Sequence, residues 1–204
     1  MTLRTNARLA GASFLIYIGA GVAGMAGRSP LPVNVAFAFT ESFCALVLAV
    51  TLYALTRDVD RDLATFGLVC RAAEGILGAM WISTTVALRT AAPTGAVDAA
   101  ATDAVIALSR SVRSLSIGVG GTFFAAGSLA FSWLLLRGRM IPAALAWIGV
   151  LASVQLVIML PLQLAGSIAP SAGIFMWLPM LAFEVPVALW FIIRGVSRDP
   201  AAAA

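Results

Sequence analysis

The sequence predicts an all-α integral membrane protein, a bundle of six transmembrane helices with the N- and C-termini in the cytoplasm. Three observations support this fold class. Of the 204 residues, 61% are hydrophobic and 11% are charged, whereas a soluble domain carries about 25% charged residues. Apolar stretches of about 20 residues recur along the chain, and each is long enough to cross the hydrocarbon core of a bilayer. The arginines are also distributed unevenly between the two sets of turns.

The spans are predicted within one membrane domain of residues 1–204, with no separate soluble domain. They cover about residues 7–27, 33–56, 63–88, 115–136, 141–166 and 171–193. Proline and glycine punctuate most of the connections, and Pro142 stands where proline favours the start of a helix. The first stretch is longer than the apolar core of a secretory signal, so we expect a retained first helix.

Orientation follows from the arginines, which account for all 13 basic residues. One side of the predicted membrane receives eight of them, namely Arg4, Arg8, Arg57, Arg61, Arg137, Arg139, Arg194 and Arg198. The other side receives four, namely Arg28, Arg89, Arg110 and Arg113. Because cytoplasmic turns are enriched in basic residues, this asymmetry predicts cytoplasmic termini. The positive charge is spread over turns and forms no single patch, which argues against nucleic acid as a partner.

The connection between the third and fourth spans contains a helical pattern. Apolar residues recur on one face at Val97, Ala101, Val105, Leu108, Val112 and Leu115. Asp103, Arg110 and Arg113 fall on the opposite face. We therefore expect an external amphipathic helix over about residues 97–113, which either lies on the outer membrane surface or extends the fourth span outward.

Small residues recur in the first and fourth spans, at Gly19, Ala23, Gly27, Gly118, Gly120, Gly121 and Gly127. Such spacing allows helix backbones to approach closely inside a membrane. The pattern has two interpretations, packing within one chain and a homodimer seam, and in a protein with six spans we favour the first.

The candidate site consists of ionisable residues that interrupt apolar stretches, namely Arg71, Glu74, Glu184 and Glu41. A charge at the centre of a bilayer costs about 2.5–3.5 kcal/mol, so each needs a reason to be there. Arg71 and Glu74 are three residues apart and can pair on one helix face. Glu184 lies at a similar depth in the last span and would complete an Arg–Glu–Glu cluster if the third and sixth spans touch. Glu41 lies about 12 Å from the external end of the second span.

Two interpretations of this cluster stay open, a structural clamp between helices and a site for a polar ligand or a proton. One arginine cannot neutralise two carboxylates, so a proton is expected to neutralise one of the glutamates. Pro161, Pro179 and Pro186 are expected to kink the last two spans. Interrupted helices around a midplane charge recur in transporter binding sites, which favours the ligand or proton interpretation slightly.

The absence of histidine excludes bis-histidine haem ligation, histidine-dependent catalysis and the usual zinc sites. The sequence also has no glycine-rich phosphate loop placed between a strand and a helix. We therefore expect no cofactor and no metal, and the balance is against an enzyme. The expected partner is the lipid bilayer, with a second membrane protein left open, as is the oligomeric state.

Eight segments of the sequence together resemble a known family. They are Ala7-Arg8-Leu9-Ala10-Gly11, Ala49-Val50-Thr51-Leu52-Tyr53, Arg57-Asp58-Val59-Asp60-Arg61, Cys70-Arg71-Ala72-Ala73-Glu74, Phe123-Phe124-Ala125-Ala126-Gly127, Leu136-Arg137-Gly138-Arg139-Met140-Ile141-Pro142, Phe183-Glu184-Val185-Pro186-Val187-Ala188-Leu189-Trp190 and Arg194-Gly195-Val196. The chain resembles a bacterial inner-membrane family described as domain of unknown function 4386. The resemblance implies six spans in the bacterial cytoplasmic (inner) membrane and no assigned activity.

The leading functional hypothesis is an integral membrane protein that handles a small solute, an ion or a proton around the buried Arg–Glu–Glu cluster. This hypothesis requires a cavity that water can enter and that reaches Glu184. The first alternative is an accessory or scaffold subunit that docks a larger membrane complex. The second alternative is an intramembrane enzyme, which would need a carboxylate pair facing a groove accessible from the lipid.

Overall fold

The computed structural model describes residues 2–25, 30–91, 99–168 and 173–196, and these residues contain six α-helices and no strand. The helices are α1 (Leu3–Met25), α2 (Leu31–Thr56), α3 (Arg61–Ala91), α4 (Ala99–Arg137), α5 (Ala143–Leu164) and α6 (Gly173–Ile193). All six are long and apolar enough to cross a membrane. The predicted six-helix membrane bundle is therefore confirmed, and most helix ends differ from the expected spans by a few residues.

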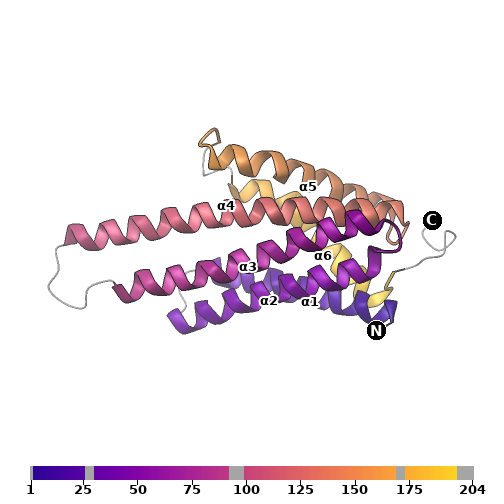
Figure 1. The fold of residues 1–204 in the computed structure, drawn as a ribbon, viewed down its shortest axis with the longest axis horizontal. Coiled ribbons are helices and arrows are strands. Elements are labelled where there is room, and N and C mark those ends of the chain that lie inside the picture. The colour runs from indigo at the N-terminus through magenta and orange to yellow at the C-terminus, as the bar shows by residue number, and fades with distance from the viewer. Residues whose placement is uncertain (1, 26–29, 92–98, 169–172, 197–204) are drawn as a thin grey trace.

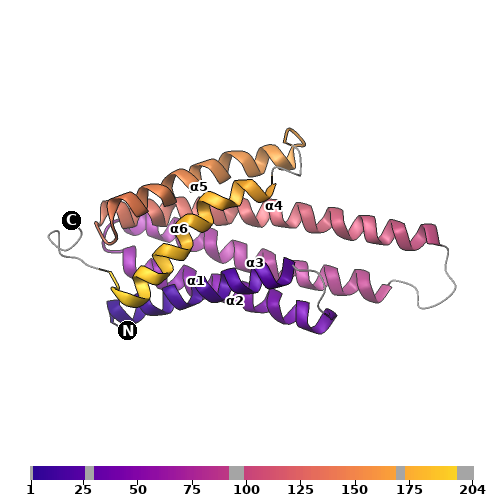
Figure 2. The ribbon, with the colours of Figure 1, turned by 180° about the vertical axis from the view of Figure 1, so that it is seen from behind.

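The helices form a closed ring in chain order (Figures 1 and 2). Each helix packs against its neighbour in the sequence, and α6 closes the ring by packing against α1. Figure 2 shows α6 crossing the rear of the bundle between α5 and α1. Residues that point into this ring meet side chains from helices distant in the sequence, so the ring can hold an interior site.

One end of the bundle gathers the start of α1, the end of α6 and the turns that follow α2 and α4 (Figure 1). Arg137 pairs with Asp60 across these two turns, with Nη1 and Oδ2 3.2 Å apart. Gly195 follows α6 in a left-handed conformation and lies beside Arg4 at the start of α1. This terminal end carries seven of the eight arginines assigned above to one side, and Arg198 lies outside the described residues.

At the opposite end, α3 and α4 project beyond the other four helices (Figure 1). The part of α4 apolar enough to span begins at Leu115, whereas the helix itself begins at Ala99. The preceding turns of α4 are therefore about 24 Å long. In the structure residues 99–113 of the predicted amphipathic segment are continuous with the fourth span in one helix, and residues 97–98 lie outside the described part.

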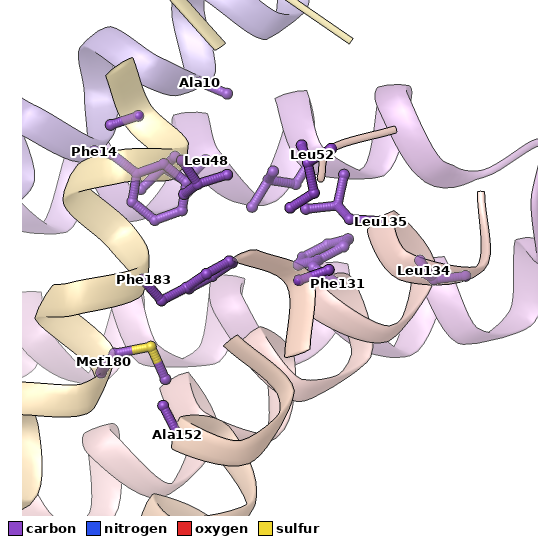
Figure 3. Close-up of a cluster of buried hydrophobic side chains, with 14 of the residues drawn as sticks. Ala10, Phe14, Leu48, Leu52, Phe131, Leu134, Leu135, Ala152, Met180 and Phe183 are labelled. Atoms are coloured by element: carbon purple, nitrogen blue, oxygen red, sulfur yellow. The ribbon is translucent and has the colours of Figure 1, made fainter. Parts of the chain in front are cut away.

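The interior near the terminal end is a packed apolar core (Figure 3). Phe14, Leu52, Phe131, Leu135 and Phe183 meet there from α1, α2, α4 and α6. Large apolar side chains also cover the outside of the bundle, among them Val22, Leu151 and Phe175. Helices that are apolar both inside and outside the bundle suit lipid surroundings, so the protein is a multi-pass membrane protein.

The helices α1 and α6, whose contact closes the ring, approach each other closely at Gly11 of α1. A Cβ atom at Gly11 would lie 2.5 Å from the carbonyl oxygen of Ala188 and 2.8 Å from Cγ1 of Ile192, both in α6. Gly19, which the repeat of small residues also singled out, has no atom within 4 Å of its Cβ position. In the fourth helix Gly118, Gly121 and Gly127 face neighbouring helices, whereas Gly120 faces open space. Packing within one chain thus accounts for part of the small-residue pattern.

We predict that Gly11→Ala opens the seam between α1 and α6. The added methyl group meets backbone, which cannot rotate away, so unfolding should become easier by about 1–3 kcal/mol. Gly19→Ala is the matched control, since its methyl group enters open space and alanine is the better helix former. Thermal unfolding of both variants in one detergent tests this, and equal stability of the two would contradict the assignment of the seam.

Candidate functional site

Arg71 lies at the centre of the site, on α3, with only 1% of its surface exposed. Gly127 of α4 makes room for its side chain, because a Cβ atom there would be 2.9 Å from Cγ and 3.2 Å from Cδ of Arg71. A guanidinium group does not lose its proton inside a protein. The ring of helices therefore encloses a permanent positive charge, and the surrounding residues must balance it.

Glu74 provides the balancing charge from the next turn of the same helix. Its Oε2 is 2.9 Å from Nη1 of Arg71, the pairing that the three-residue spacing predicts. Its Oε1 accepts a hydrogen bond of 2.6 Å from the hydroxyl of Tyr17 on α1. Both oxygens of Glu74 thus have partners, and this network of Arg71, Glu74 and Tyr17 connects α3 to α1 across the ring.

Aromatic rings complete the surroundings of the guanidinium. Its central carbon is 4.6 Å from the ring centre of Phe124 on α4 and 5.4 Å from that of Tyr17. The rings of Phe124 and Tyr17 are nearly parallel, and Trp177 of α6 lies 5.5 Å beyond Phe124. Cation–π contacts of this kind stabilise a desolvated cation by up to about 2 kcal/mol each. Arg71 is therefore held by an aromatic layer as well as by a carboxylate.

Glu184 faces the same interior from α6 and is 5% exposed. It is close enough to interact electrostatically with both Arg71 and Glu74. The helices α3 and α6 are not neighbours in the ring, so these groups face each other across its interior. Oε1 of Glu184 is buried and has no hydrogen-bond partner among the described residues. Oε2 of Glu74 also lacks a hydrogen-bond partner among the described residues, but it has the ion pair with Arg71, whereas Oε1 of Glu184 has neither.

A small cavity lies beside Arg71, on the side toward the terminal end. Its volume is about 10 Å³, which is about the room that one water molecule needs. Ser128 and Ser132 of α4 supply hydroxyl groups to its wall. Nε and Nη2 of Arg71 and Oγ of Ser132 are buried, and the described residues offer them no hydrogen-bond partner. Apolar side chains form the rest of the wall, namely Phe14, Leu52, Phe131, Leu135, Phe183, Val187 and Phe191.

Glu41 is half-buried at the seam between α1 and α2. It lies beside Gly21, whose Cβ position is 3.4 Å from Oε1 of Glu41. Pro161 is in the last turn of α5, and Pro179 and Pro186 are inside α6, which remains helical past both of them. Glu184 lies between these two prolines, two residues before Pro186.

A larger groove of about 280 Å³ lies away from the charges, between α3 and α4. Its wall is apolar and consists of Leu63, Phe66, Ala126, Leu129, Ala130 and Trp133. No charged group lines it, so it offers no contact that would recognise a polar solute. The chemically equipped part of the interior is the small space around Arg71.

Sequence reasoning gave no defined role to several residues of the site. Tyr17 is a polar residue in an apolar stretch with no spacing that relates it to Arg71 or Glu74, and Gly127 was noted only as a small residue. The spacing of Ser128 and Ser132 places them on one helix face, and this spacing could have indicated a polar wall. Phe124 carries no such signal, because phenylalanine is common in membrane helices.

Comparison with family models relates residues 21–195 to the family described as Domain of unknown function (DUF4386). The chain belongs to this family. The matched residues include Arg71, Glu74, Glu184 and the helices from α2 to α6, whereas Tyr17 precedes them. Neither the curated proteins nor the solved structures gave a match. The family description names no activity, so a functional conclusion has to come from the geometry of the site.

We predict that Tyr17→Phe destabilises the bundle while keeping the ring beside Arg71. The substitution removes the hydrogen bond to a charged, buried oxygen of Glu74, which should cost about 1.5–3 kcal/mol. Tyr53→Phe is the matched control, because the described residues give the Tyr53 hydroxyl no hydrogen-bond partner. Denaturation of both variants in the same detergent measures the difference. Equal stabilities would mean that Tyr17 does not hold Glu74.

Proposed function

We propose that the protein handles protons in the membrane, and that Glu184 is the group that takes up and releases the proton. The observation that carries this proposal is the buried, unpartnered Oε1 of Glu184 opposite the paired Arg71 and Glu74. Arg71 and Glu74 cancel each other in charge, so an ionised Glu184 leaves the site with one excess negative charge. A buried charge without a partner is costly, and a proton removes that cost.

The two glutamates differ in ways that suggest separate tasks. Glu74 has a charged partner and a hydrogen-bond donor, as a group that fastens helices together should have. Glu184 lacks a hydrogen bond at Oε1 and therefore contributes less to holding α6 in place. Functional sites often retain groups that lower stability. The clamp and the proton site, which were alternatives for one cluster, are in this proposal assigned to different members of it.

Size favours a proton over an organic solute. The cavity beside Arg71 has room for about one water molecule, and pockets for small organic ligands measure about 300–1,000 Å³. The groove of larger volume carries no charged group. The leading hypothesis requires a cavity that water can enter and that reaches Glu184, and in this proposal that cavity is a narrow site with room for about one water molecule.

Arg71 offers a way to couple proton release to movement. Only Nη1 of its guanidinium is paired, and Nε and Nη2 are free to donate hydrogen bonds. When Glu184 loses its proton, it becomes a second carboxylate that competes with Glu74 for this cation. A shift of Arg71 toward Glu184 would weaken the connection from α3 to Glu74 and Tyr17, and would strengthen one between α3 and α6.

We predict that acidification adds a proton to Glu184 in the purified protein. Infrared difference spectra of the protein in lipid should show the carboxyl stretching band of a protonated acid, growing as the pH falls. Glu184→Gln should abolish this band, and Glu41→Gln, a glutamate at the seam of α1 and α2, should retain it. A band that survives in Glu184→Gln, or a wild-type protein without a band, would contradict the proposal.

We further propose that the protein lies in the bacterial inner membrane with both termini in the cytoplasm. The arginines gathered at the terminal end support this orientation, because basic turns favour the cytoplasmic side.

We predict that a fluorescent protein fused after Val196 is active in cells, and that a periplasmic phosphatase inserted after Gly166 is active as well. The reverse pattern of activities would invert the orientation.

A further inference from the structure

We propose that the cavity beside Arg71 binds one water molecule, and that this water connects Glu184 to the terminal end of the bundle. The inference rests on the proposed function, because it concerns the route by which a proton reaches Glu184. It adds a binding site for water and a direction of access.

Unsatisfied polar groups define the water site. Arg71 presents Nε and Nη2, and Ser132 presents a hydroxyl that can both donate and accept. Arg71 and Ser132 are each only 1% exposed, and both line the cavity. A buried water molecule typically makes two to four hydrogen bonds to such groups. The size of the cavity and the number of open partners therefore both match a single water molecule.

The cavity reaches the turn of α6 that carries Glu184, although Glu184 itself is not among the residues that line it. Phe183 and Val187, which lie one residue before and three residues after Glu184 on α6, line its wall. The titratable groups that face Glu184 are Tyr17 of α1 and Arg71 and Glu74 of α3, and α5 contributes none from Ala143 to Leu164. When Glu184 loses its proton, the cation that faces the new carboxylate is therefore Arg71, which in this proposal also binds the water.

The two sides of Arg71 differ, and this difference gives the direction. Toward the terminal end the cavity wall includes Leu52, Leu135 and Phe191, which lie within about one turn of the ends of α2, α4 and α6. At greater distance from that end, the aromatic layer that includes Phe124 and Trp177 covers the guanidinium. On the terminal side of Arg71 there is therefore a cavity whose apolar wall lies close to the helix ends. On the far side, packed aromatic rings cover the guanidinium.

The proton step is balanced as follows. The bound water donates one proton to Oε1 of Glu184, and it receives one proton from a hydronium ion that arrives past Leu52 and Leu135 and leaves as water. Glu184 becomes neutral, the bound water is restored, and one positive charge has moved from the terminal side to the middle of the bundle. Release of the proton reverses each transfer.

The test uses the full chain in vesicles with one orientation and follows the protonated Glu184 infrared band after a rapid acid jump on one side. We expect the band to rise faster after a jump on the terminal side than after a jump on the opposite side. Ser132→Ala should slow the rise about 10-fold, the effect of losing one hydrogen bond to the water, and should leave the final amplitude unchanged. Ser153→Ala is the control, since its hydroxyl bonds to the Gly149 carbonyl and does not line the cavity.

The outcomes separate the two proposals. A band that is absent from the wild type overturns the proposed function, and the water route falls with it. A band that rises faster from the opposite side, or that rises at the wild-type rate in Ser132→Ala, overturns the water route alone. A rise that depends on chloride concentration at constant pH would mean that an anion occupies the cavity, which also overturns it. The sidedness of the wild type needs no variant and stands if Ser132→Ala fails to fold.

Discussion

The structure depends on the burial of one permanent positive charge, Arg71, inside a ring of six apolar helices. Lipid and apolar side chains cannot solvate a guanidinium, so the chain must supply its partners. Gly127 leaves space for the side chain, and Glu74 supplies the opposite charge. Tyr17 donates a hydrogen bond to Glu74, and the rings of Tyr17 and Phe124 both contact the guanidinium. These groups come from α1, α3 and α4, so the charge can be satisfied only when helices distant in the sequence are assembled. Arg71 thereby determines which helices must meet inside the ring, and apolar packing in lipid alone does not determine this.

The ring in turn explains why a second carboxylate can face Arg71 without forming the same contacts. Glu184 comes from α6, which is adjacent to α1 and α5 and not to α3. It therefore approaches the pair of Arg71 and Glu74 from across the interior, where a small cavity and two unpaired guanidinium nitrogens remain. Closure of α1 on α6 at Gly11 holds this arrangement. Glu74 has an ion pair and a hydrogen bond, whereas Oε1 of Glu184, on the opposite wall, has no hydrogen-bond partner among the described residues. This difference is the basis for assigning the proton to Glu184.

Much of the fold was predictable, because the period and length of apolar stretches define membrane helices directly. The pairing of Arg71 with Glu74 was also predictable, since it depends on spacing within one helix. The order of helices in the ring was not, because apolar helices have no surface pattern that selects neighbours. For the same reason the contacts of Arg71 with Tyr17 and Phe124, and the cavity at Ser132, required the structure. The third and sixth helices are not neighbours in the ring, yet Glu184 interacts electrostatically with Arg71 and Glu74 across its interior.

The division of tasks between the two glutamates is tested most directly by the unfolding free energies of Glu74→Gln and Glu184→Gln, measured beside the wild type in one detergent. Glu74→Gln removes the counter-charge of a buried guanidinium and should cost about 3–5 kcal/mol. Glu184→Gln removes a carboxylate whose Oε1 has no hydrogen-bond partner among the described residues, and it should cost little or raise the stability. This pair of results would support Glu74 as the structural group and Glu184 as the functional one. A loss in Glu184→Gln as large as that in Glu74→Gln would mean that both glutamates fasten the bundle, and would contradict the assignment of a proton site.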